Sequence, residues 1–94
     1  MYARVVRFTD VSPDRIQAIK DRISAEDGPP PGVDSVGLRL YFDASQGTAV
    51  FVGMFETEEK MRAAGEVLEA MDSTDTPGTR ASIDNCELAL ERDA

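Results

Sequence analysis

The chain has 94 residues and a formal net charge of −8 at pH 7, from 10 basic and 18 acidic side chains. A chain this short fits one domain with a modest core, because folding buries only roughly 60 to 70% of its unfolded surface. The acidic balance argues against nucleic acid and anionic membranes as partners, since both attract cationic surfaces. The absence of histidine excludes a catalytic triad built on that residue.

Cysteine usage and the opening residues indicate where the protein works. Cys86 is the single cysteine, so no disulfide forms within the chain, which suits the reducing cytoplasm. The first twenty residues are too charged for a signal peptide, and no uncharged stretch approaches the ~20 residues of a membrane span. Clusters of residues typical of zinc or calcium sites are missing, and we expect neither a metal nor a cofactor.

The first two predicted elements are a strand over 3–8 and a helix over 12–26. The strand is a short, β-branched apolar run. Ser12 is typical of a helix N-cap and Pro13 of the first helical position, and Gly28 before three prolines ends the helix. The apolar stripe of this helix consists of Ile16, Ile19 and Ile23.

Two strands joined by a hairpin loop are predicted over 36–55. The first strand alternates apolar and polar residues, and the loop is expected at 43–47. The second strand, 49–55, is apolar on both faces, although a sheet with helices on one side leaves its other face to water. We therefore expect a dimer that covers this strand, the alternative being a central strand with an exposed apolar face. The candidate interface residues are Val50, Phe51 and Val52.

A second helix is predicted over 57–71, a loop over 72–79 and a last strand over 82–90. Thr57 is a typical N-cap, and the two glutamates after it favour the positive end of the helix dipole. In the last strand Cys86 alternates with polar residues, and we expect it to be a small buried hydrophobe.

The resulting order is β-α-β-β-α-β, which is typical of a ferredoxin-like α+β domain. We expect residues 1–94 to form a single such domain. Its four-stranded antiparallel sheet would carry both helices on one face.

Four short segments carry a family resemblance: residues 1–5, the helix start at Pro13, Pro31-Gly32-Val33, and residues 55–59 at the second helix. Together they resemble the dimeric α+β barrel superfamily, in its antibiotic-biosynthesis-monooxygenase-like branch. The resemblance implies a homodimer in which two sheets face each other, with a cavity between each sheet and its helices. Members include cofactor-independent oxygenases acting on aromatic polyketides, haem-degrading enzymes and isomerases, so the fold alone does not define the activity.

This chain lacks several residues that the enzymes of the superfamily use, which limits the activities and site residues that we expect. Without histidine the axial haem ligand is missing, so we expect no haem degradation. The oxygenases are associated with a Trp, Asn, Tyr and Arg group, but this chain has no tryptophan and a single asparagine. A tyrosine and an arginine on one strand face would orient an acidic or phenolic ligand, the alternative being polar dimer contacts. The candidate ligand-binding residues are Tyr41, Arg39, Asn85 and Arg7.

Three functional hypotheses follow. The favoured one is a homodimeric protein that binds a small hydrophobic or aromatic metabolite. The second is a cofactor-independent monooxygenase or isomerase using Tyr41, Arg39 and Asn85. The third is an RNA-recognition module, which shares the element order but conflicts with the charge and the aromatic spacing. For the dimer, we predict that Asp at Phe51 or Val52 causes dissociation, because a buried charge is costly.

Overall fold

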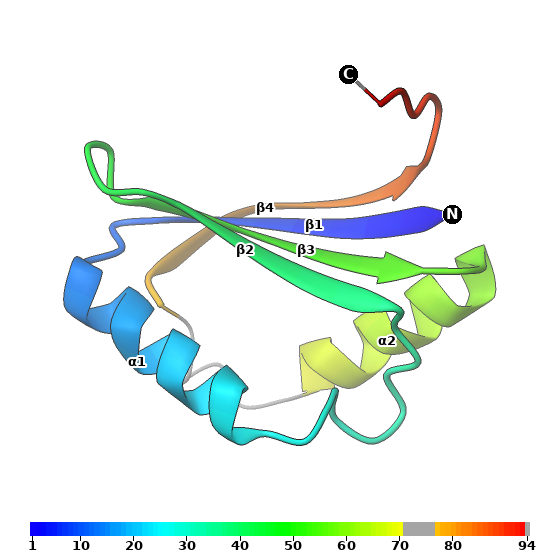
Figure 1. The fold of residues 1–94 in the computed structure, drawn as a ribbon, viewed down its shortest axis with the longest axis horizontal. Helices are drawn as coiled ribbons and strands as arrows, with labels where there is room; N and C mark the ends of the chain where they lie inside the picture. The colour runs from blue at the N-terminus through cyan, green and yellow to red at the C-terminus, as the bar shows by residue number, and fades with distance from the viewer. Residues whose placement is uncertain (71–76, 94) are drawn as a thin grey trace.

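The computed structural model describes residues 1–70 and 77–93 and has a ferredoxin-like α+β fold. Its elements are β1 (Tyr2–Thr9), α1 (Pro13–Ala25), β2 (Gly37–Asp43), β3 (Thr48–Phe55), α2 (Glu58–Ala70) and β4 (Thr79–Glu87). The strands form one antiparallel sheet in the order β2-β3-β1-β4, and both helices lie on the same side of it (Figure 1). The predicted fold class is confirmed. Within the described residues, no helix has the length and apolar character needed to cross a membrane.

Both helices begin at the predicted caps. The Oγ of Ser12 accepts a hydrogen bond from the backbone N of Arg15 at 3.2 Å, and Pro13 is the first helical residue. The Oγ1 of Thr57 accepts one from the backbone N of Lys60 at 3.1 Å. These bonds satisfy amide groups that have no partner within the helix, which is why short polar residues favour these positions.

Two clusters of buried side chains fill the space between sheet and helices. The first contains Val6, Phe8, Val11, Ile16 and Ala49, and the second Phe55, Met61 and Ala64. Phe51 packs against the first cluster, where its ring meets that of Phe8 edge to face with centroids 5.4 Å apart. This geometry is favourable for aromatic pairs and commits Phe51 to the helix-covered face.

The last strand differs most from its prediction, since β4 begins and ends three residues earlier than 82–90. Its pairing with β1 explains the shift. The ladder runs from Thr9 opposite Thr79 to Tyr2 opposite Glu87, and the N of Leu88 donates to the O of Met1 at 2.9 Å. Among the described residues the ladder goes no further, and β4 ends at Glu87. The predicted helix end at residue 71, and the predicted loop as far as residue 76, lie outside the described residues.

Candidate functional site

The sheet face opposite the helices, called the open face below, is the candidate site. The strand register sets its side chains in rows across β2, β3, β1 and β4, because directly opposed residues of antiparallel strands point to the same side. The middle row consists of Arg39, Val52, Val5 and Asp84. The flanking rows consist of Gly37, Met54, Ala3 and Cys86, and of Tyr41, Val50, Arg7 and Ser82.

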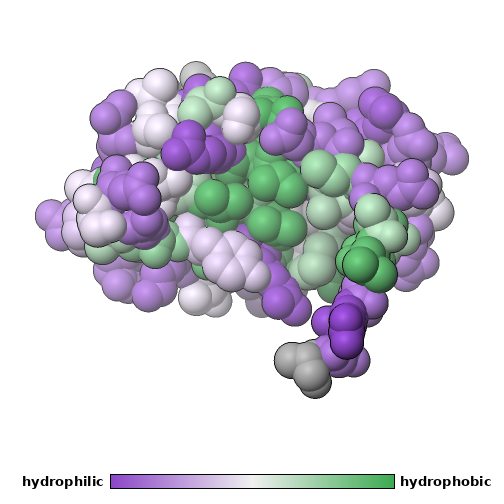
Figure 2. Space-filling model, turned by 90° about the horizontal axis from the view of Figure 1, so that it is seen from above, coloured by the Kyte–Doolittle hydropathy of each residue, from purple (hydrophilic) through white to green (hydrophobic). Residues whose placement is uncertain are grey.

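The centre of the open face is apolar. Figure 2 shows a hydrophobic patch there, bordered by polar and charged side chains. In the register it corresponds to the residues of the two central strands, chiefly Val5, Val50 and Val52, with Ala3 and Met54 beside them. Each of these side chains is half-buried, although no helix or strand in residues 1–70 and 77–93 packs over it (Figure 1). A contiguous apolar patch rimmed by polar residues marks a binding surface.

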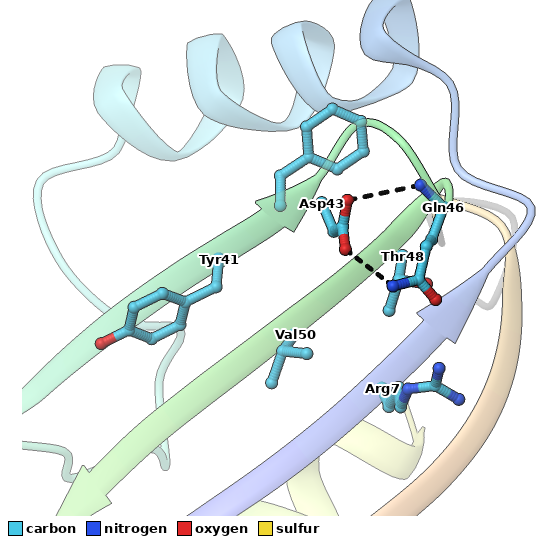
Figure 3. Close-up of a pocket in the computed structure, with 7 residues that line it drawn as sticks. Arg7, Tyr41, Asp43, Gln46, Thr48 and Val50 are labelled. Atoms are coloured by element: carbon cyan, nitrogen blue, oxygen red, sulfur yellow. Dashed lines mark hydrogen bonds between the residues drawn. The ribbon is translucent and has the colours of Figure 1, made fainter.

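A shallow, open hollow of about 340 Å³ lies at the hairpin end of the open face (Figure 3). Its lining consists of Arg7, Tyr41, Phe42, Asp43, Gln46, Thr48 and Val50. Tyr41 and Arg7 stand on either side of Val50, which is opposite both in the register. A phenol, a guanidinium and an apolar floor together suit a small apolar molecule that carries an acidic or phenolic oxygen.

Asp43 at the rim of the hollow holds the hairpin loop. Its carboxylate accepts hydrogen bonds from the backbone N and Oγ of Ser45, at 3.0 and 2.6 Å, and from the backbone N and Nε2 of Gln46, at 3.3 and 3.0 Å. The bond from the Ser45 hydroxyl is the main reason that the pKa of Asp43 lies below its ordinary value. Asp43 therefore stays ionised near neutral pH, and its carboxylate stabilises the hairpin turn.

The structure brings together three of the four predicted ligand-binding residues. Tyr41 and Arg7 line the hollow, and Arg39 lies in the next row of the same face. Asn85 lies opposite Arg4, which points toward α2, and so belongs to the helix-covered face. The face on which Asn85 lies follows from the pairing of β4 with β1, which the sequence analysis did not predict.

The predicted interface residues also divide between the faces. Val50 and Val52 lie on the open face, whereas Phe51 packs in the core. The prediction that Cys86 is buried is wrong for the protomer, in which this residue is exposed. Cys86 lies on the open face of the edge strand β4, opposite Ala3 of β1.

A charged group on the helix-covered face was missed from the sequence. Glu69 of α2 pairs through one oxygen with the Nη2 of Arg4 at 2.9 Å and with the Nη1 of Arg80 at 2.7 Å. Burial lowers the pKa of Arg4, and the charge of Glu69 opposes that shift. Gly65 of α2 lies beside Arg4, and a Cβ there would make an ordinary contact, 3.6 Å from the Nε of Arg4. The sequence signal for this charged group was an arginine, Arg4, at a strand position that faces the helices. The group connects β1, α2 and β4.

Within residues 1–70 and 77–93, no group of three or more His, Cys, Asp or Glu side chains is placed to hold a metal ion. Comparisons with protein-family models, curated proteins and solved structures found no match for this chain. The functional argument therefore starts from the geometry of the open face and its hollow.

Proposed function

We propose that the protein is a homodimer of the dimeric α+β barrel type, in which the open faces of two sheets pack together and hold a small apolar ligand. The observation that carries this proposal is the apolar centre of the open face, which the protomer leaves uncovered. Removing apolar surface from water is favourable by roughly 25 cal/mol per Å². Two sheets packed ~10 Å apart would bury both centres at once.

The composition of the open face supports a protein partner over RNA. RNA-recognition domains of this element order stack bases on aromatic side chains of the central strands. Here the central strands present Ala3, Val5 and Arg7 on β1, and Val50, Val52 and Met54 on β3. None of these is aromatic, and the net charge of −8 repels a phosphate backbone.

The hollow beside Tyr41 supports the ligand-binding part of the proposal. It lies at the hairpin end of the open face, so two apposed sheets would convert it into a compartment between the copies. The monooxygenase alternative relies on Tyr41, Arg39 and Asn85 acting together, and Asn85 lies on the other face. The geometry therefore favours binding over catalysis by this set.

The dimer is tested by native mass spectrometry and sedimentation of the wild type and of Val52→Asp. We expect two chains for the wild type at micromolar concentration and one chain for the variant, because a charge at the centre of the seam is costly to bury. Ala63→Asp on the exposed side of α2 adds the same charge elsewhere and should remain dimeric. A wild type that stays monomeric at tens of micromolar contradicts the proposal.

The ligand site is tested with 1-anilinonaphthalene-8-sulfonate, an aromatic anion whose fluorescence rises in apolar surroundings. We expect wild-type protein to bind this probe and Arg7→Ala to bind it roughly three- to tenfold more weakly, since a charge-assisted contact is lost. Arg62→Ala removes a cation from the exposed side of α2 and serves as the control. Equal affinities for the two variants would argue against the hollow as the site.

A further inference from the structure

We infer that the two copies pack with β2 of each protomer over β4 of the other, which sets Arg39 opposite the partner's Asp84. The inference rests on the proposed homodimer and adds the orientation of the partner. It follows from where the open face carries charge.

The middle row of the open face is electrically asymmetric. Arg39 lies at the β2 edge and Asp84 at the β4 edge, with Val52 and Val5 between them. Both charged residues are exposed, and neither forms an ion pair with any described residue. Neighbouring strands are ~4.8 Å apart, and three such spacings separate β2 from β4. Arg39 and Asp84 are therefore roughly 14 Å apart and do not neutralise each other.

Symmetry leaves few ways to place a second copy on this face. In a face-to-face homodimer the two-fold axis lies in the plane between the sheets. An axis across the strands sets β2 over β2 and β4 over β4, which opposes Arg39 to Arg39 and Asp84 to Asp84. An orthogonal crossing moves Arg39 and Asp84 over the partner's central strands, so the two opposite charges no longer face each other. An axis along the strands sets β2 over β4 and pairs the opposite charges twice.

The sizes of the neutral side chains agree with the axis along the strands. This axis sets β3 over β1, so Val52 meets the partner's Val5 and the larger Met54 meets the partner's Ala3. Met54 also lies over Gly37 of its own protomer, where an added Cβ would come within 2.9 Å of its terminal methyl group. Large residues facing small ones let two apolar layers interdigitate.

A charge-swap experiment tests the pairing. Arg39→Glu and Asp84→Arg each place like charges opposite each other twice per dimer, and we expect each to weaken dimerisation roughly ten- to a hundredfold at low salt. The double variant restores both pairs with reversed sign and should dimerise within about threefold of the wild type. A double variant as weak as the product of the single effects overturns the inferred pairing while leaving the dimer in place. A monomeric wild type instead overturns the dimer itself.

Crosslinking gives a second readout that does not depend on charge. In a Cys86→Ser background, one protein carries Arg39→Cys and the other Asp84→Cys. A short bismaleimide should join the two proteins in a mixture and should join neither protein to itself. Self-crosslinking of either one would indicate that like strands face each other and would overturn the pairing.

Discussion

On the helix-covered face Phe55 is 1% exposed and Ala49 fully buried, whereas on the open face Val50 and Val52 of the same strand remain half-buried. All four belong to β3, in which successive side chains point to opposite sides of the sheet. The faces differ because α1 and α2 both cover one side (Figure 1). An apolar strand residue is thus fully buried only where another element packs on its face, which is the basis for proposing a second copy on the open face.

Adjacent substitutions on β3 give the largest expected contrast between the faces. Phe51→Asp should lower the free energy of unfolding by about 3 kcal/mol or more, because it removes a ring that packs against the buried cluster and places a charge on the helix-covered face. Val52→Asp should lower it by less, about 1 kcal/mol in the protomer, because Val52 is only half-buried and a carboxylate on the open face can reach water. Urea unfolding at low protein concentration measures both. Similar losses for the two variants would show that the faces are not distinct.

The charged group under the sheet should have a smaller effect. Glu69→Gln leaves the half-buried Arg4 without its carboxylate partner and should cost about 1 to 2 kcal/mol of stability. Glu58→Gln is the control, because its pair with Arg62 is exposed and contributes no more than about 0.5 kcal/mol. Thermal unfolding distinguishes these values, and equal losses would mean that Arg4 does not need Glu69.

Two glycines near the helix-covered face should respond with opposite signs. Gly65→Ala should stabilise the protein by roughly 0.5 to 1 kcal/mol, because alanine favours a helix and the nearest atom is an ordinary 3.6 Å away. Gly78→Ala should destabilise it, since the new Cβ would overlap the backbone oxygen of Thr9. Denaturation midpoints check both signs, and a stabilising Gly78→Ala would contradict the close approach of the Thr9 carbonyl to Gly78.

The smallest effect is expected at the rim of the open face. The pKa of Asp43 is lowered in the folded state, so the stability that it adds is fully present above its unfolded pKa of ~3.9. That stability is lost as the pH falls through the lower folded value. Carboxyl NMR titration should show Asp43 titrating below ordinary aspartates, and Asp43→Asn should reduce the acid dependence of thermal unfolding. Titration at or above the ordinary value would contradict the turn described here.

The sequence predicted the local features of the fold well. Ser12 and Thr57 cap their helices as expected, and the hairpin loop occupies residues 44–47 of the predicted 43–47, because Asp43 ends β2. Capping and turn formation depend on neighbours within a few residues, which is why pattern alone suffices. The apolar character of both faces of β3 was also readable, but the dimer inferred from it stays a prediction.

The candidate site was only partly predictable. Tyr41 and Arg39 share a face by simple alternation, but Arg7 reaches the hollow only because β3 lies between β2 and β1. Asn85 and Cys86 were misplaced because their faces are set by the ladder of β4 with β1, which places Asn85 opposite Arg4 and Cys86 opposite Ala3. A pairing partner distant in sequence leaves no trace in a local pattern.

The sequence by itself therefore determined the order of elements, their caps and the presence of two apolar faces. Only the tertiary structure decided which face the helices cover, and hence that Phe51 enters the core while Val52 remains open. The physical reason is the two-residue period of a strand. Where both sets of alternate residues are apolar, hydrophobicity cannot choose between them, and the choice falls to the packing of distant elements.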